Sequence, residues 1–314
     1  MDDLTFVQQR TLRDLMSVRR FPVFEPGVAS GLRDRLQAMA RELDLATPLW
    51  LSKERLTDRG RCEGLFLAGL QGRRPPFAHS PRTAHGALFH KSIELDVGAG
   101  GSVDPRIVAE KAAERLRDDR AFGAYWDGLE PLARGELVTE AVRRLDLFRA
   151  SFPPLARSWA PVPEQWLRAD LAGGSLVLSG RVDLMLGPPD RDPSAASRLV
   201  IDLKSGDARP EYVEDLRFYA LLMCLRVGVP PYRVASFFLD SGEWQAEDVT
   251  VETLDHAAGR VEDAARSAAA LRSGSSPSLR PGRYCGWCPE RPDCPAAAAA
   301  FGPDPLHDEP GGML

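Results

Sequence analysis

Carboxylates and a lysine occur together in two short motifs of this sequence. Asp202 and Lys204 stand two positions apart in an otherwise apolar run, so a β-strand would place the carboxylate and the ammonium on the same face. Asp183 ends a second motif, Gly-Arg-Val-Asp, in another segment with strand periodicity. Two carboxylates from neighbouring strands beside a lysine predict a site for Mg²⁺ or Mn²⁺ and for an anionic oxygen. Such a site suits hydrolysis of a phosphodiester bond.

The lysine is the informative residue in this set. Of the 40 basic residues in the chain only four are lysines, so arginine is the default cation. A compact ammonium orients a water molecule or offsets charge in a transition state better than a planar guanidinium does. We therefore expect Asp183 and Asp202 to hold the metal ion and Lys204 to assist the reaction. The alternative is an ordinary salt bridge at the end of a strand.

His90 is the candidate for a third metal ligand. It lies in a helical pattern with Glu94 four positions later, and an imidazole nitrogen is a common ligand of divalent ions. A histidine on a helix is more often a structural or surface residue, so the ligand role depends on the two carboxylates found elsewhere in the chain. Glu94 and His85 are weaker candidates for the same site.

Three cysteines cluster in a segment rich in glycine and proline. Cys285, Cys288 and Cys294 have the spacing C-x2-C-x5-C, which lacks a fourth ligand nearby. Cys62 can supply it, because Cys224 lies among leucines in a helical run and is expected in the core. Four thiolates can hold a tetrahedral Zn²⁺ or an iron–sulfur cluster, and the spacing alone does not separate the two. Either group would brace the N-terminal helices against the strands, and three unligated thiols are the remaining alternative.

Composition limits the class of protein. The 314 residues are 44% hydrophobic and 27% charged with a net charge of −5, which is ordinary for a globular protein and excludes collagen, coiled coil and wholesale disorder. No run approaches the roughly 18 apolar residues of a membrane span, and the acidic start is unlike a secretory signal. We therefore expect a soluble, cytoplasmic protein without disulfides. Residues 53–91 hold eight basic and three acidic side chains, a local balance of +5 in an acidic chain.

The elements that carry these residues follow from hydrophobic periodicity and capping signals. Helices are predicted at 31–45, from Ser52 toward residue 66, at 83–95, through 105–152, at 212–227 and at 251–271. Strands are predicted at 176–186, 198–204, 233–239 and 246–251, with the first two as neighbours. The sequence thus predicts a mixed β-sheet flanked by helices, in which Asp183 and Asp202 lie on adjacent strands.

The order of the motifs resembles the RecB-like branch of the PD-(D/E)XK nuclease superfamily over roughly residues 52–295. The motifs that carry the resemblance are Cys62, Gly86-x3-His90-x3-Glu94, Gly-Arg-Val-Asp183, Asp202-x-Lys204, a helix with Tyr219, and the three later cysteines. Within that branch the sequence is most similar to the cluster-bearing group that includes CRISPR-adaptation exonucleases and AddB-type subunits of helicase–nucleases. The resemblance implies an α/β fold with a restriction-endonuclease-like core, an N-terminal helical region and a C-terminal cysteine loop.

The resemblance also implies roles for individual residues. It carries the metal ligands to His90, Asp183 and Asp202. The implied catalytic residues are the same two aspartates, Lys204 and Tyr219. The one-before-three arrangement of cysteines implies a [4Fe–4S] cluster rather than zinc, with these ligands: Cys62, Cys285, Cys288 and Cys294.

One position departs from the family pattern. Where the family has Gln four residues before the tyrosine, this chain has Asp215. A carboxylate one helical turn from Tyr219 could repel DNA phosphates or rearrange the site. Asp215 therefore bears on how active the site is.

The resemblance suggests a division of the chain into domains. It consists of a helical segment at 1–50, a nuclease domain at 51–300 with a helical insertion at about 105–152 and a cysteine loop at 281–295, and a disordered tail at 301–314.

These observations support three hypotheses. The first is a metal-dependent DNA nuclease, an exonuclease that prefers single strands, in DNA repair, recombination or CRISPR adaptation. Its basic stretch would follow the phosphates, with Arg73, Arg74 and Trp50 as candidate contacts to backbone and bases. The chain has no G-x4-G-K-[ST] motif, so any motor would be a helicase partner. The second hypothesis, favoured by Asp215 and the negative net charge, is a DNA-binding or assembly module with a degenerate site. The third is a zinc-stapled protein with no role on DNA.

Overall fold

The computed structural model describes residues 4–18, 21–45, 47–155, 157–187, 195–204, 206 and 208–302 of the chain. The chain divides into two compact units, each assembled from separated stretches of sequence. The first comprises Met1–Gly31, Phe77–Leu167 and Gly180–Leu254, and the second comprises Leu32–Pro76, Arg168–Ser179 and Asp255–Leu314. The predicted tail at 301–314 lies outside the described residues except for its first two positions.

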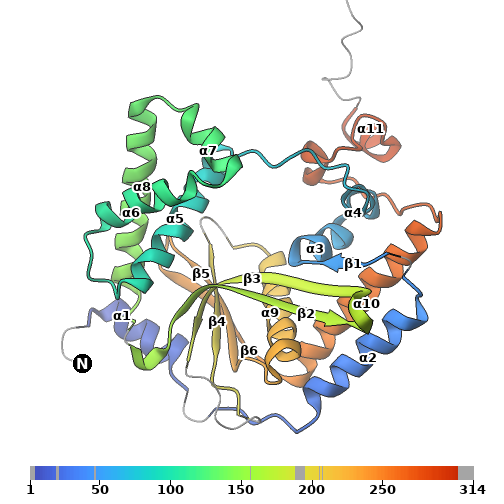
Figure 1. The fold of residues 1–314 in the computed structure, drawn as a ribbon, viewed down its shortest axis with the longest axis horizontal. Coiled ribbons are helices and arrows are strands. Elements are labelled where there is room, and N and C mark those ends of the chain that lie inside the picture. Colours follow the sequence, from blue (N-terminus) through green and yellow to red (C-terminus); the bar gives the residue numbers. More distant parts are fainter. Residues whose placement is uncertain are drawn as a thin grey trace, which may run out of the picture. The chain divides into compact units, whose positions relative to one another are not determined.

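The first unit contains the strands that carry the predicted metal site (Figure 1). The strands are β2 (Val162–Leu171), β3 (Leu176–Leu186), β4 (Leu199–Lys204), β5 (Arg233–Phe238) and β6 (Glu243–Asp248). β2 and β3, which pair with each other, also extend into the second unit. β3 pairs antiparallel with β4, β4 parallel with β5, and β5 antiparallel with β6. This mixed sheet confirms the predicted fold class and the predicted pairing of the two motif-bearing strands.

Consecutive helices form a helical layer in the first unit (Figure 1). They are α5 (Pro81–Gly98), α6 (Pro105–Leu116), α7 (Arg120–Asp127) and α8 (Pro131–Ser151). Ser80, Asp104 and Asp119 cap the first three, because each side-chain oxygen accepts hydrogen bonds from backbone N–H groups of the first turn. Their apolar sides meet in a buried cluster around Leu88 and Phe122. The predicted helical insertion corresponds to α6, α7 and α8.

Helices cover both faces of the sheet. Phe237 of β5 packs against Phe152, the residue that follows α8, with ring centroids 4.6 Å apart. The next residue, Phe238, faces Tyr212 of α9 (Glu211–Val227), with ring centroids 6.3 Å apart. Because successive side chains of a strand point to opposite faces, the end of α8 and the start of α9 lie on opposite sides of β5.

The first described residues are anchored to the sheet of the first unit. They form α1 (Phe6–Arg10) and a π-helical turn, η1 (Thr11–Met16). The hydroxyl of Tyr232 donates to the carbonyl oxygen of Met16 at 2.8 Å, and Nη1 of Arg233 donates to that of Leu15 at 2.9 Å. These bonds satisfy carbonyl groups that the irregular helix leaves without helical partners.

The second unit is mainly helical. Its elements are α2 (Val28–Glu42), β1 (Leu49–Leu51), α3 (Lys53–Arg61), α4 (Glu63–Leu70), α10 (Val251–Arg272), η4 (Arg283–Trp287) and α11 (Pro295–Phe301), of which α2 and α10 begin within the first unit. β1 pairs in parallel with the first residues of β3. The prediction that the first fifty residues are helical is wrong at β1, where buried Leu49 and Leu51 alternate with exposed Trp50 as in a strand. None of the described helices has the length and apolar composition needed to cross a membrane.

β2, like β1, is a strand that the sequence-based prediction missed. From Trp166 to Leu171 exposed and buried residues alternate strictly, which is a strand signal. The start of the strand hides this signal, because Pro163 removes a backbone donor and Glu164 has a positive φ of 51°. Two short 3-10 helices are the remaining elements, η2 (Arg157–Trp159) and η3 (Ala172–Gly174).

Candidate active site

The site lies in the first unit, where the backbone pairing of β3 with β4 gives way to a hydrogen bond between a backbone and a side chain. Leu184 of β3 pairs with Ile201 of β4 in the backbone register. Beyond that pair, the backbone N–H of Leu203 donates to Oδ2 of Asp183 at 2.7 Å. The carboxylate thus serves as an acceptor for β4, and it lies against the Asp-Leu-Lys motif. The sequence predicted these two motifs on neighbouring strands, and they are.

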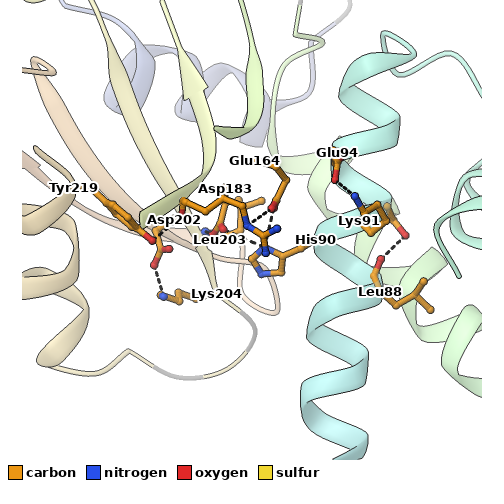
Figure 2. Close-up of polar contacts among 12 residues, drawn as sticks. Leu88, His90, Lys91, Glu94, Glu164, Asp183, Asp202, Leu203, Lys204 and Tyr219 are labelled. Atoms are coloured by element: carbon orange, nitrogen blue, oxygen red, sulfur yellow. Dashed lines mark hydrogen bonds and ion pairs between the residues drawn. The ribbon is translucent and has the colours of Figure 1, made fainter. Parts of the chain in front are cut away.

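Three side chains converge beside this hydrogen bond (Figure 2). Nδ1 of His90, on α5, lies 3.3 Å from Oδ1 of Asp183 and 3.7 Å from Oε1 of Glu164, on β2. One ligand atom of each residue lies within 4.8 Å of the other two, and no other set of three His, Cys, Asp or Glu side chains in the described part of the chain is so close. An imidazole and two carboxylates fit the ligand preferences of Mn²⁺, and the carboxylates those of Mg²⁺.

The charge on His90 follows from its neighbours. Burial lowers the pKa of the imidazole, but the carboxylates of Asp183 and Glu164 outweigh that effect and raise it to about 10. Without a metal ion the imidazole therefore carries a proton at neutral pH and is attracted to both carboxylates. A divalent cation would occupy the same electrostatic position as that proton.

Glu164 is the site residue that the sequence did not reveal. Its side chain is 13% exposed, and its Oε2 lies 2.8 Å from Nε of Arg181, within ion-pair distance. Its backbone lies in the left-handed region with φ of 51°, which costs a residue other than glycine about 1 kcal/mol or more. Two charged partners, Arg181 and His90, hold the carboxylate at this position. Strain of this kind is typical of functional sites.

Asp202 and Lys204 form an ion pair beside the three-residue group. Asp202 is buried, with 1% of its side chain exposed, and its Oδ2 pairs with Nζ of Lys204. The ammonium also lies 4.4 Å from the ring centroid of Tyr212, a favourable cation–π distance. The close group thus contains Glu164 where the sequence predicted Asp202. A direct metal contact by Asp202 stays a prediction.

Tyr219 supports the strand that carries Asp183. Its side chain is 1% exposed, and its hydroxyl donates to the carbonyl oxygen of Arg181 at 2.6 Å. Its ring lies so close to Gly180 that a Cβ there would stand 2.8 Å from Cε1 of the tyrosine. These contacts make Tyr219 a positioning residue, and its predicted part in catalysis stays a prediction. Asp215, one turn earlier on α9, is half-buried.

The residues predicted to contact DNA belong to the second unit. Nη1 of Arg73 lies 2.8 Å from Oε2 of Glu290, and Arg74 pairs with the buried carboxylate of Asp58. Trp50 is 49% exposed. Both arginines are thus engaged in ion pairs, whereas the indole is accessible.

Four cysteines line one pocket of the second unit: Cys62, Cys285, Cys288 and Cys294. These are the four that the sequence grouped together. Cys62 and Cys285 are buried, and the other two are partly exposed. Burial raises the pKa of the Cys288 thiol, a backbone hydrogen bond at Glu290 opposes this, and the charges of Cys62 and Cys285 raise it further. Cys224 is fully buried on α9, as expected for a core thiol.

Hydrogen bonds hold the cysteine loop against α3 and α4. The hydroxyl of Tyr284 donates to the carbonyl oxygen of Arg61, 223 positions away, at 2.9 Å. Oε2 of Glu63 accepts from the backbone N–H of Ser278 at 2.8 Å. Because these anchors flank Cys62 directly, they bring it to the loop that carries the other three cysteines.

The family of the protein is established by its sequence. The model of the PD-(D/E)XK nuclease superfamily matches residues 51–295, more than three quarters of the chain. The chain belongs to the PD-(D/E)XK nuclease superfamily.

Solved structures include two similar chains. An exonuclease candidate from Eubacterium rectale is 12% identical with a TM-score of 0.46, over 73% of this chain and 84% of that one. The protein SSO0001 is 15% identical with a TM-score of 0.33, over 86% of this chain and 97% of that one. No curated protein matches the sequence.

Proposed function

We propose that this chain is a metal-dependent deoxyribonuclease of the RecB-like branch, an exonuclease that acts on single-stranded DNA or on DNA with a free end. The observation that carries the proposal is the convergence of His90, Glu164 and Asp183 in a member of a nuclease superfamily. DNA repair, recombination or CRISPR adaptation would employ such an enzyme, with a helicase or an adaptation protein as its partner.

The side chains around the site divide the chemistry among them. His90, Asp183 and Glu164, with Asp202 close by, would hold Mg²⁺ or Mn²⁺, which supplies Lewis-acid polarisation of the phosphate when bound. Lys204 offsets the negative charge that grows on the phosphate oxygens during attack by water. Asp202 and the Tyr212 ring fix the ammonium in advance, so that no reorganisation is needed when the charge develops.

The direct test is cleavage of an end-labelled single-stranded oligonucleotide with Mn²⁺. We expect Lys204→Ala to lower the rate by about 10²-fold or more, because a fixed electrostatic partner is lost. Lys111→Ala, on α6, is the matched control and should cleave like the wild type. A circular single strand should resist cleavage if the enzyme needs an end. Undiminished cleavage by Lys204→Ala would contradict the proposed role of this lysine.

A second candidate function is a DNA-binding or assembly module with a weak active site. Asp215 favours it, because this half-buried carboxylate stands where the family has glutamine, one turn from Tyr219. Purified protein that binds the oligonucleotide in EDTA but does not degrade it with Mn²⁺ or Mg²⁺ would support this candidate over the first. Asp215→Gln would then be expected to restore degradation.

We also propose that the cysteine pocket holds a [4Fe–4S] cluster with a structural role. The residues fit such a group, because four thiols from two distant parts of the chain line one pocket. The cluster would fasten the cysteine loop to the α3–α4 turn, where hydrogen bonds already join them.

A further inference from the structure

Arg181 is the basic residue of the site that the chemistry proposed above does not use. It stands two positions before Asp183 on β3, with the buried Val182 between them, so both side chains point to the same side of the strand. Its side chain is 62% exposed, compared with 12% for Asp183. A long cationic side chain therefore extends into solvent beside the proposed metal ligands.

Two contacts position Arg181, one at its backbone and one at its guanidinium. The hydroxyl of Tyr219 donates to the carbonyl oxygen of Arg181 at 2.6 Å, which holds the backbone. Nε lies 2.8 Å from Oε2 of Glu164, an ion-pair contact that holds the guanidinium beside this carboxylate. Among the residues that the structure describes, Glu164 is the one carboxylate within ion-pair distance of this guanidinium. The guanidinium has two further nitrogens, Nη1 and Nη2, and most of this side chain is exposed to solvent.

The carboxylate of Glu164 joins Arg181 to the proposed metal site. One of its oxygens, Oε2, forms an ion pair with Nε of Arg181, and the other, Oε1, lies 3.7 Å from Nδ1 of His90. The strained backbone at Glu164 keeps its carboxylate between these two partners. A residue with a strained backbone whose carboxylate joins a histidine and an arginine in this way is typical of a functional site.

We infer that Arg181 binds a phosphate group of the nucleic-acid strand next to the bond that is cut, with Glu164 as its positioning residue. A planar guanidinium can donate Nε–H to a carboxylate and still offer its outer N–H groups to phosphate oxygens in parallel. Lysine offers its three donors from a single nitrogen, so it lacks the planar pair of parallel donors that matches a phosphate group. This inference rests on the proposed function, and it adds the group that holds the substrate in register with the metal site.

Binding in the absence of cleavage tests the inference. The affinity of the wild type and of Arg181→Met for a single-stranded oligonucleotide is measured by fluorescence anisotropy in EDTA over a range of salt concentrations. We expect the substitution to weaken binding roughly tenfold or more, as for one lost charge-assisted contact. The slope of log affinity against log salt should fall by about 0.7, the value for one phosphate contact to a single strand. Arg181→Lys should recover only part of the affinity.

The matched control is Arg106→Met on α6. Arg106 resembles Arg181 in exposure, 60% against 62%, and in pairing through Nε with a glutamate, Glu110. It should leave affinity and salt slope unchanged. If Arg181→Met and Arg106→Met bind DNA alike, the inference is wrong and Arg181 only joins β2 to β3.

Two further measurements distinguish this inference from a role of Arg181 in building the metal site and from the proposed function. Mn²⁺ binding, followed by electron paramagnetic resonance without DNA, should be retained by Arg181→Met, and its loss would mean that the arginine only builds the metal site. Glu164→Gln should weaken DNA binding less than Arg181→Met does. Failure of the wild type to cleave DNA would count against the proposed function, whereas unchanged DNA binding by Arg181→Met counts against this inference alone.

Discussion

At the scale of single residues, Gly180 and Tyr219 pack so closely that each explains the residue type at the other position. The ring of the tyrosine occupies the space that a side chain at position 180 would need, and its hydroxyl holds the backbone at the next residue. This packing fixes the backbone of β3 two residues before Asp183. Glycine in the Gly-Arg-Val-Asp motif is therefore required by close approach and not by its backbone conformation.

Gly180→Ala should consequently destabilise the protein and weaken its site. The added Cβ would stand 2.8 Å from Cε1 of Tyr219, so the ring or the strand must move. We expect a loss of about 1–3 kcal/mol in the free energy of unfolding, measured by urea denaturation. Gly135→Ala is the control, since a Cβ there meets nothing within 4 Å in the middle of α8. It should stabilise the protein by up to about 1 kcal/mol, and equal effects of the two substitutions would contradict the packing argument.

The residues of the site were accessible to sequence reasoning to different degrees. Asp183 and Lys204 belong to motifs whose two-residue periodicity places them on strands, and those strands pair as predicted. Glu164 was not accessible, because Pro163 and a left-handed backbone interrupt the strand pattern just where it lies. No spacing in the sequence connects it with His90, 74 positions earlier, and only the folded chain brings the two together.

At the scale of elements, the helical layer depends on one buried ion pair. Asp96, near the end of α5, is 4% exposed and pairs with Arg149, near the end of α8. Nη2 of this arginine also donates to the carbonyl oxygen of Val103 at 2.6 Å. The pair therefore joins the two helices and the turn that leads into α6, and it holds the helix that carries His90 at its C-terminal end.

We expect Arg149→Met to lower the free energy of unfolding of the protein. The substitution leaves the buried carboxylate of Asp96 without its partner, and breaking a buried pair from one side costs about 3–5 kcal/mol. Arg117→Met removes an arginine that pairs with Asp127 on the surface, where both side chains are more than half exposed, and it should cost less than about 1 kcal/mol. Urea denaturation of the two variants provides the comparison, and similar losses would show that burial of the Asp96 pair is not what matters.

The elements were predicted well where local signals are strong. β3 has the predicted bounds, because polar and apolar residues alternate through its middle, from Ser179 to Leu184, between apolar ends, and the Ser52 cap sets the start of α3. β1 was missed because three residues carry too little periodicity to outweigh the helical pattern before them. The partners of each strand depend on contacts between distant segments, which local pattern does not encode.

At the scale of the whole molecule, the two units are interleaved along the chain. The chain passes between them five times, after residues 31, 76, 167, 179 and 254. The proposed metal ligands all belong to the first unit and the pocket cysteines all belong to the second. Motifs that follow one another in the sequence, such as Cys62 and His90, thus serve different sites, and neither unit can be obtained by a single truncation.

At the scale of the whole molecule, the metal content of the protein tests the proposal for the cysteine pocket. Protein purified without oxygen should be brown and contain about four irons per chain, as for a [4Fe–4S] cluster. Cys285→Ser should lose the colour and the iron, because it removes one of the four thiols that line the pocket. Cys224→Ser, which alters the fully buried thiol of α9, should keep both. Stoichiometric zinc in place of iron, or iron retained in full by Cys285→Ser, would contradict the proposed cluster.

The central claim is that His90, Glu164 and Asp183 form one metal site. Crystals soaked in Mn²⁺ test it directly, since anomalous scattering locates the ion independently of any assay. The account predicts a single strong peak within about 2.0–2.3 Å of a nitrogen of His90 and a carboxylate oxygen of Asp183. Loss of this peak in crystals of Asp183→Asn would confirm the assignment. Mn²⁺ bound elsewhere in the wild type, with His90 still in contact with both carboxylates, would contradict it.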